Sequence, residues 1–243
     1  MTDYNKKMVR ILGFVFLIFA IFWLGINIGV VFKVYEIKCD DMDTFVSQKY
    51  QNCIKVLGMI VPIMYGLVFY YIFMLRDEYI IIRYGRRNYE KKETKKILIL
   101  SIIFASEYMA VDLIFSTVFI KVNVLLQTGF YIFILLKFIM LVFYLNLIGE
   151  TLFFVRNLLD FSPVYVILGT AVYVFLSMLY SIMFEKISPV FYMDFSEEWF
   201  LDKMFDTFSY IINIAKMFLS SLILMYLGQI TFMKRDIIGN EEV

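Results

Sequence analysis

The stretch ILILSIIFASEYMAVDLIFSTVFI, residues 97–120, decides the fold class of this chain. A helix needs about 20 apolar residues to cross the hydrocarbon core of a bilayer, and this run is long enough. Its apolar residues are continuous and do not alternate with a period of two, which favours a membrane helix over a barrel strand. The run also contains two acids, Glu107 and Asp112, whose place inside a membrane needs an explanation.

Five further apolar runs of similar length lie along the chain. The composition agrees, since 62% of the 243 residues are hydrophobic and 19% are aromatic, with a net charge of +1 that points to neither nucleic acid nor a polyanion. A soluble domain of this size needs far more polar surface. We therefore predict an all-α integral membrane protein, with residues 1–243 forming one transmembrane domain of six transmembrane helices. The predicted spans are 11–32, 54–75, 97–120, 124–149, 163–184 and 207–232.

The positions of Lys and Arg predict the orientation of these spans, because loops inside the cell carry an excess of basic residues. The basic clusters fall before span one, between spans two and three, between spans four and five, and after span six. With an even number of spans, all of them share one side, which predicts an N-in, C-in topology. The opposite loop 185–206 fits, because it holds six acids against two lysines. The basic residues are Lys6, Lys7, Arg10, Arg76, Arg83, Arg86, Arg87, Lys91, Lys92, Lys95, Lys96, Arg156, Lys234 and Arg235.

The predicted outer loops carry two local features. In SEEWFLDKMFDTF, residues 196–208, Ser196 is a candidate N-cap, and the two glutamates that follow suit the first turn of a helix. This pattern predicts a short outer amphipathic helix before span six, and the alternative is a plain continuation of span six. Cys39 and Cys53 share the first outer loop, where they form either a disulfide or two unpaired thiols.

Four ionisable residues lie within the predicted spans. A charge at mid-bilayer costs about 2.5–3.5 kcal/mol on insertion scales, so each needs a partner or a wet cavity. If the turn between spans three and four centres near Val122, Glu107 and Lys137 lie at the same depth. Asp112 and Lys216 lie at matching distances from the ends of spans three and six. We therefore predict the ion pairs Glu107–Lys137 and Asp112–Lys216, with a proton or cation relay as the alternative.

The sequence offers no catalytic constellation. It contains no histidine, which removes a common metal ligand and the commonest general base together. None of the motifs H-E-x-x-H, G-x-S-x-G or G-x-x-x-x-G-K-[ST] occurs. We therefore expect no enzyme activity, no metal and no cofactor in this chain. A membrane bundle of this kind can still move substrate if a separate ATPase drives it, which requires a surface for that ATPase to push on.

The charged stretch RDEYIIIRYGRRNYEKKETKK, residues 76–96, supplies a candidate for such a surface. It packs eight Lys or Arg and four Asp or Glu residues between two apolar runs. The positive-inside rule accounts for the basic residues. It does not account for the interleaved Tyr79 and residues 80–82, which are poor choices for a solvated loop. A helix, a break at Gly85 and a second charged helix running into span three predict a compact ledge below the membrane.

The segment EYIIIRYGRRNYEKK, residues 78–92, resembles the cytoplasmic loop of type-2 ABC-exporter permeases. The resemblance covers the whole chain in topology but only about 15 residues as a motif. In that family, this loop between spans two and three holds a coupling helix that docks into a groove on the ATPase subunit. The resemblance therefore implies ATPase contacts at Glu78, Tyr79, Arg83, Tyr84, Arg86 and Arg87.

The resemblance also implies the setting of the protein. It implies the permease subunit of an ATP-driven exporter in a bacterial cell membrane, with ATP and Mg held by a separate ABC ATPase. The permease would work as a homodimer or with a related permease. Small Gram-positive relatives often export peptides or protect the producer against lantibiotics and other bacteriocins, which implies a peptide or another amphipathic substrate. Spans one, two and five line the substrate path in such folds, which singles out Phe14, Phe22, Trp23, Tyr65 and Tyr173.

Two other function classes stay open. The first is a non-transporting membrane protein, such as an immunity factor that sequesters a peptide or a sensor subunit, and it would have no ATPase partner. The second is a proton-coupled secondary transporter that uses Glu107 and Asp112, and its transport would survive ATP depletion but collapse with the proton gradient.

Overall fold

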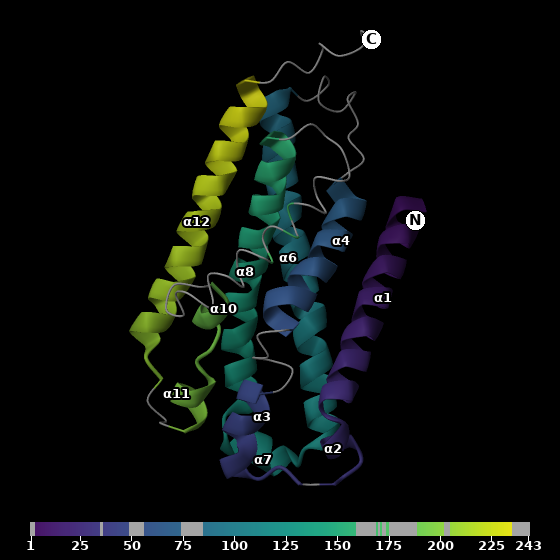
Figure 1. Cartoon of the computed structure of the whole chain (residues 1–243), viewed down its shortest axis with the longest axis vertical. Coiled ribbons are helices and arrows are strands. Elements are labelled where there is room, and N and C mark those ends of the chain that lie inside the picture. Colours follow the sequence, from purple (N-terminus) through teal and green to yellow (C-terminus); the bar gives the residue numbers. More distant parts are fainter. Residues whose placement is uncertain are drawn as a thin grey trace.

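The computed structural model describes residues 3–34, 36–48, 56–73, 85–158, 169, 171, 174, 189–201 and 205–234. This part of the chain is all-helical (Figure 1). Four of its helices are long and apolar enough to cross a membrane: Val56–Phe73, Asn88–Phe119, Phe130–Leu158 and Thr207–Met233. These are the lengths and compositions of a membrane protein. The elements are α1 (Asp3–Ile26), α2 (Ile28–Val31), η1 (Cys39–Asp41), α3 (Met42–Gln48), η2 (Val56–Ile60), α4 (Val61–Phe73), α6 (Arg86–Phe119), α7 (Val122–Gln127), α8 (Phe130–Leu158), α10 (Pro189–Tyr192), α11 (Ser196–Phe200) and α12 (Thr207–Lys234).

The four long helices correspond to the predicted spans two, three, four and six. The first predicted span, 11–32, contains a shorter apolar helix, Arg10–Ile26, followed by α2 after a turn at Asn27. Nearly all of the fifth predicted span, 163–184, lies outside the described residues. An all-helical fold with four helices able to cross a membrane is therefore established, and the count of six stays a prediction.

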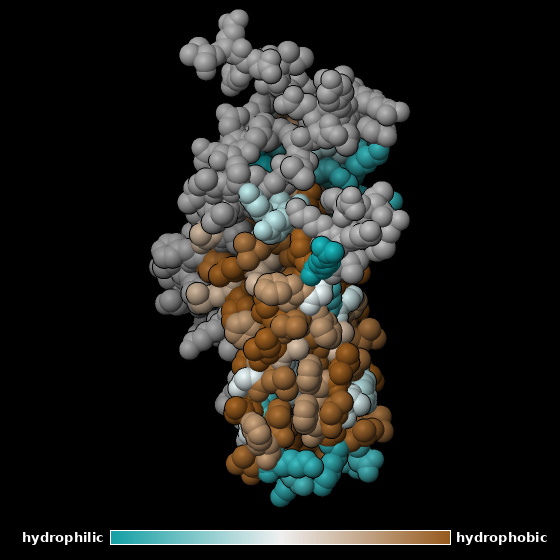
Figure 2. All heavy atoms as spheres, turned by 90° about the vertical axis from the view of Figure 1, so that its right-hand side faces the viewer, coloured by the Kyte–Doolittle hydropathy of each residue, from teal (hydrophilic) through white to brown (hydrophobic). Residues whose placement is uncertain are grey.

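The bundle has two ends. The α7 end carries α2, α3, α7 and α11, and the Gly85 end carries the start of α6 and the end of α8 (Figure 1). Apolar residues cover the middle of the molecule, and hydrophilic residues gather at the α7 end (Figure 2). This distribution suits a molecule whose middle faces hydrocarbon and whose ends face water.

Helix α8 lies at the centre of the bundle and binds its neighbours through buried polar side chains. Tyr144 Oη donates to Leu57 O (3.1 Å), in the wide π-helical turn that begins the helix of α4. Arg156 Nη1 donates to Phe73 O (2.8 Å), at the other end of α4. Asn157 Nδ2 donates to Gly228 O of α12 (3.4 Å). Carbonyls at irregular turns and helix ends lack intrahelical partners, so Tyr144 and Arg156 stabilise the backbone of α4 where it needs donors.

Aromatic rings fill the contact between α1, α4 and α6. The ring of Phe19 meets those of Phe104 and Tyr108 edge-on, at centroid distances of 5.4 and 5.1 Å. Tyr65 of α4 meets Phe104 edge-on at 5.4 Å, and its hydroxyl lies 2.9 Å from Ser101 Oγ. Edge-on pairs of this kind add a favourable electrostatic contact to the burial of the rings. Three helices are thus held by one aromatic cluster.

The turn between α6 and α8 differs from the predicted one. The predicted fourth span, 124–149, begins inside α7, a separate short helix that ends at Gln127. Gly129 follows with φ +69°, a left-handed conformation that glycine adopts readily, and its N–H bonds Leu126 O (3.2 Å). The helix that crosses the bundle then runs from Phe130 to Leu158. Gln127, Thr128 and Gly129 interrupt the apolar run at this break, but the predicted span began at 124 and ran through them.

The short helix predicted before span six forms as α11, which is confined to Ser196–Phe200. Its first turn carries the two predicted glutamates. The N-cap is Phe195, so the prediction of Ser196 as N-cap is wrong by one residue. Ser196 is the first helical residue, and its hydroxyl donates to Asp194 Oδ1 (3.0 Å).

Candidate functional site

The candidate site is formed by two buried ionisable side chains, Asp112 and Lys137, which lie at the same depth in the bundle. Asp112 lies on α6, and its side chain is almost completely buried. Its Oδ1 accepts hydrogen bonds from Trp23 Nε1 of α1 (2.7 Å) and Ser116 Oγ (3.4 Å). Its Oδ2 forms no hydrogen bond within the described part of the chain. A carboxylate in this position has capacity to bind one more proton or donor.

Lys137 lies on α8 and is fully buried. Its Nζ donates to Met193 O (2.6 Å), in the turn after α10. The ammonium also lies 6.0 and 5.8 Å from the ring centroids of Phe133 and Phe195. Aromatic faces and a carbonyl oxygen both attract a cation, so the two contacts stabilise the charge away from water. This lysine therefore ties the segment after α10 to the central helix.

Neither predicted ion pair forms among the described residues, which include all four of the side chains concerned. The first prediction, Glu107–Lys137, is wrong because the turn is longer than assumed. Lys137 lies seven residues after Phe130, and Asp112 lies seven residues before Phe119, so these two are level with one another. Asp112 and Lys137 attract each other electrostatically without direct contact.

The second predicted pair, Asp112–Lys216, is wrong because the two side chains have other partners. Lys216 is exposed on α12, where Nζ bonds Asn213 Oδ1 (3.4 Å) and lies 5.0 Å from the ring centroid of Tyr192. Glu107 is partly exposed on α6, and its Oε2 forms no hydrogen bond within the described part of the chain. The four charges therefore do not act as two pairs.

The four described residues of the predicted substrate path occupy two kinds of environment. Phe14 and Phe22 are exposed on α1, whereas Trp23 is fully buried against Phe115 and Phe119. Tyr65 is also fully buried, in the aromatic cluster with Phe104. Tyr173 lies outside the described residues. Trp23 and Tyr65 therefore contribute to the packing of the described helices, and the predicted substrate path stays a prediction.

The predicted ATPase contacts fall largely outside the described residues. This applies to Glu78, Tyr79, Arg83 and Tyr84, while Arg86 and Arg87 begin α6. The predicted charged helix is confirmed, because α6 starts directly after Gly85 and continues without a break into the apolar span. Gly85 is exposed and has φ +73°, so the chain turns there in a conformation suited to glycine.

Sequence reasoning did not predict that Glu150 and Arg156 of α8 are buried towards the Gly85 end. Both lie on α8 beyond position 149, where the apolar run stops and the predicted span was ended. Glu150 Oε2 forms no hydrogen bond within the described part of the chain, and Glu90 of α6 is close enough for the two carboxylates to repel each other. The continued spacing of apolar residues after 149 was the available signal that the helix goes on.

Cys39 carries a free, exposed thiol, and its Sγ lies 3.3 Å from Gln127 Oε1. Cys53 lies outside the described residues. Within the described ranges, no group of three or more Asp, Glu or Cys side chains is arranged to hold a metal ion. The polar side chains of the site can bind and release protons and form hydrogen bonds.

Acidic residues gather separately at the α7 end, where α3 packs against α11. Burial raises the pKa of the Asp43 carboxyl above its ordinary value, and the nearby charges of Glu197 and Asp194 raise it further. Glu36 behaves in the opposite way, because its hydrogen bond and charge contact with Lys121 lower its pKa. The pKa of Asp43 is therefore shifted upwards and that of Glu36 downwards, so acid affects the stability contributions of the two carboxyls in opposite directions.

Comparisons of this chain with protein-family models, with curated proteins and with solved structures found no match.

Proposed function

We propose that this chain is the membrane-spanning permease subunit of an ATP-driven exporter in a bacterial cell membrane. ATP and Mg are bound by a separate ABC ATPase, and a second permease completes the transporter. In this proposal the chain has six spans, and the Gly85 end with both termini faces the cytoplasm. The substrate is a peptide or another amphipathic molecule.

The observation that carries the proposal is the continuity of α6. Helix α6 runs for 34 residues from Arg86, so the charged segment and the apolar span form one rod (Figure 1). A continuous helix transmits a push at its end along its axis, whereas a flexible loop absorbs it. Helix α6 also packs against α8 and α1. A force applied beside Gly85 therefore reaches the helices that hold Asp112 and Lys137.

The start of α6 is also anchored to the bundle. Glu90 and Glu93 are buried although they lie in the charged segment, and Glu93 Oε1 pairs with Lys96 Nζ (2.6 Å). The ring of Tyr89 stacks on Phe232 of α12 at a centroid distance of 6.0 Å. One side of this segment is therefore fixed, and its exposed side stays available to a partner. Lys91 and Lys95 lie on the exposed side.

The test is capture of the ATPase by the tagged, full-length chain from its native membrane. Reversing the charges of Arg83 and Arg86 with glutamate should abolish both capture and ATP-dependent efflux. The matched control reverses Lys33 and Lys38, which are exposed at the α7 end, so it changes the net charge equally but away from the docking surface and should preserve capture. Equal capture by both variants, or no ATPase with the parent chain, would contradict the proposal.

A second candidate, a proton-coupled transporter, is favoured by one specific observation. Asp112 and Glu107 both lie in the span with a carboxylate oxygen that forms no hydrogen bond among the described residues. Such oxygens are available to bind a proton. Transport that survives ATP depletion, and that Asp112→Asn abolishes, would select this candidate over the exporter.

A further inference from the structure

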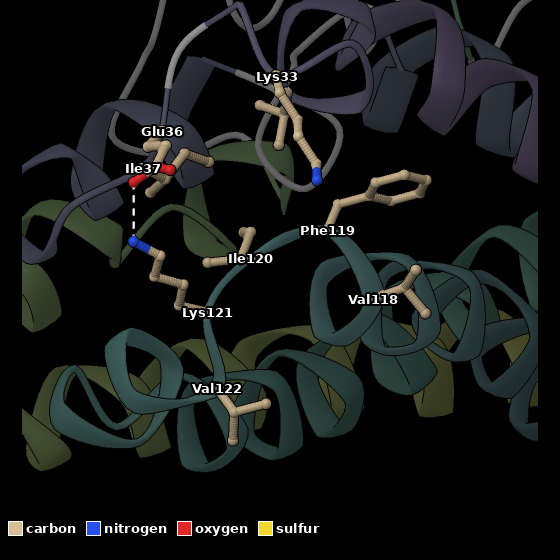
Figure 3. Close-up of a pocket in the computed structure, with 9 residues that line it drawn as sticks. Lys33, Glu36, Ile37, Val118, Phe119, Ile120, Lys121 and Val122 are labelled. Carbon is tan, nitrogen blue, oxygen red and sulfur yellow. Dashed lines mark hydrogen bonds and ion pairs between the residues drawn. The ribbon is translucent and has the colours of Figure 1, made fainter.

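The α7 end contains a hollow between the end of α2 and the turn from α6 to α7 (Figure 3). Its volume is about 390 Å³, within the range of roughly 300–1,000 Å³ that is usual for small-molecule sites. Residues from two parts of the chain line it, the region after the start of α2 and the turn 118–122. The lining residues combine apolar walls with three charges: Val30, Lys33, Glu36, Ile37, Val118, Phe119, Ile120, Lys121 and Val122.

The three charges of the hollow are not equivalent. Lys121 Nζ donates to Glu36 Oε2 (2.8 Å), so these two neutralise each other. The ammonium of Lys33 forms no hydrogen bond or ion pair within the described residues. In Figure 3, the side chain of Lys33 extends from the end of α2 into the hollow, while Lys121 reaches to Glu36. The hollow therefore offers one unneutralised cation.

Lys33 occupies a backbone position that favours glycine. Its φ is +53°, in the left-handed region. Val34 N donates to Gly29 O (2.9 Å) and Lys33 N donates to Val30 O (3.1 Å), the two bonds of a Schellman motif that ends α2. The residue in the place of Lys33 is usually glycine, because a side chain there is strained. Strained residues of this kind cluster at functional sites, so the ammonium, which glycine cannot supply, has a role here.

The rim of the hollow is apolar and faces outward. Phe32, Val34 and Val118 are 72%, 77% and 69% exposed. Helix α6 ends at Phe119, so the hollow lies where a membrane-crossing helix leaves the hydrocarbon. Lysine side chains near helix ends place their stems on apolar surface and their charge at the interface. An occupant must therefore carry an apolar part for the rim and one anionic group for Lys33.

We propose that this hollow binds a membrane phospholipid with a net negative charge, whose phosphate has no ammonium of its own, with Lys33 contacting the phosphate and the acyl chains lying against Val118 and the rim. A phospholipid supplies both parts at the depth where the hollow lies. Free phosphate carries the same anionic group but no apolar part. The site does not depend on an ATPase, because every residue involved belongs to the α7 end.

Trp23 provides a reporter for this site. Its indole stacks on Phe119, which lines the hollow, at a centroid distance of 5.8 Å. The chain has two tryptophans, so Trp199→Phe leaves Trp23 as the only one. The full chain with this substitution is reconstituted in nanodiscs that contain brominated phosphatidylglycerol or, at the same mole fraction, brominated phosphatidylcholine. Bromine quenches a nearby indole, so the binding of an anionic lipid is read as a difference in quenching.

We expect stronger quenching by brominated phosphatidylglycerol, and at least a twofold loss of that excess in Lys33→Gly. Glycine suits the left-handed backbone, so this variant removes the ammonium while retaining the thermal stability of the parent. Lys33→Asn, which also tolerates this backbone, should give the same loss. The matched control Lys38→Gln removes an exposed charge from the same end but outside the lining, and it should retain the excess.

Three results would overturn the proposal. The first is equal quenching by the two lipids in the parent. The second is an equal loss in Lys33→Gly and Lys38→Gln, which would reduce the effect to general surface charge. The third is displacement of the brominated lipid by millimolar inorganic phosphate, which would assign the hollow to free phosphate. Native mass spectrometry of the detergent-purified chain counts the lipids that it retains. We expect one phosphatidylglycerol on the parent chain and none on Lys33→Gly.

Discussion

The indole of Trp23 donates a 2.7 Å hydrogen bond to the carboxylate of Asp112, joining α1 to α6 inside the apolar part of the bundle. The sequence separation is 89 residues, so this bond forms only when the two helices have packed. It links the first predicted span to α6, which in turn packs against α8. Helix α1 is therefore positioned by a polar contact as well as by the packing of Phe19.

Removal of this donor should destabilise the bundle. In Trp23→Phe the ring still packs against Phe115 and Phe119, but Oδ1 of Asp112 loses its shortest hydrogen bond. A hydrogen bond to a charged group contributes about 1.5–3 kcal/mol, so the free energy of unfolding in detergent should fall by that amount. Trp199→Phe is the control, because its indole donates to a part-buried carbonyl at the α7 end and should cost less.

The stability lost in Trp23→Phe should depend on the carboxylate of Asp112. In an Asp112→Leu background no buried acceptor is left unpaired, so Trp23→Phe should then cost little. A double-mutant cycle measured by thermal unfolding separates this coupling from lost packing. Equal costs in both backgrounds would show that the indole acts through packing alone.

The revised depth of Lys137 gives a second prediction. Lys137→Gln removes a buried charge that Asp112 faces at the same level, and it weakens the bond to Met193 O. Asp112→Asn should restore part of the lost stability, with a coupling of about 0.5–3 kcal/mol, because it removes the carboxylate that has lost its nearby cation. Unfolding in detergent measures stability, and amide exchange across 189–201 measures how tightly that segment is held.

Glu107→Gln is the matched control for this rescue. It removes a carboxylate from the same helix, but at a depth that the structure does not align with Lys137. It should leave the cost of Lys137→Gln unchanged. A rescue by Glu107→Gln as large as that by Asp112→Asn would restore the pairing expected from the sequence.

The contrast between these pairings shows what the sequence could predict. Apolar runs predicted four helices that could cross a membrane, because burial in hydrocarbon demands about 20 apolar residues in a row. The depth of one charge against another depends on the length of the turn between helices. That turn contains α7 and Gly129. The polar residues Asn123, Gln127 and Thr128 and the glycine indicate a break there, but the predicted span began at 124 and ran through them. Because the turn is a few residues longer than predicted, Asp112 and not Glu107 lies level with Lys137.

The sequence also could not predict the hydrogen bonds from side chains to carbonyls that are distant in the chain. Arg156 was counted as a loop residue by the positive-inside rule, whereas it lies buried on α8 and donates to Phe73 O. The need for that donor arises from the end of another helix, so no local pattern around Arg156 contains it. The outline of the fold followed from composition, and the polar contacts required the tertiary structure.

Gly149 supplies a third prediction, about packing. A Cβ at this position would lie 2.5 Å from Ile97 Cγ2 and 2.7 Å from Tyr65 Oη, closer than real Cβ atoms approach. Gly149→Ala should therefore separate α8 from α4 and α6, and overpacking of this kind typically costs about 1–3 kcal/mol. Gly25→Ala is the control, since nothing lies within 4 Å of its added methyl group. Thermal unfolding in detergent should show a loss for Gly149→Ala only.

The acidic cluster at the α7 end gives a prediction about pH. Burial, together with Glu197 and Asp194, raises the pKa of Asp43 above its ordinary value. The folded form therefore holds this proton more tightly than the unfolded form does. Packing of α3 on α11 is then strongest below the ordinary pKa of about 3.9, and weakens as the pH rises from there through the raised pKa. Asp206 has the opposite sign, because hydrogen bonds from Ser209 lower its pKa, so its contribution is lost as the pH falls.

Trp199, on α11, reports this packing. Its fluorescence, taken as the difference between the parent and Trp199→Phe, should shift towards a more exposed indole as the pH rises from 3 to 7. Asp43→Asn carries no charge at position 43 at any of these pH values. Its Trp199 fluorescence should therefore stay at the value seen at pH 3 up to pH 7. Asp206→Asn should leave the shift in place, because that residue lies outside the contact between α3 and α11. A shift that persists in Asp43→Asn would assign the pH response to Asp194 or Glu197 instead, since both carboxylates would still repel each other across the same contact.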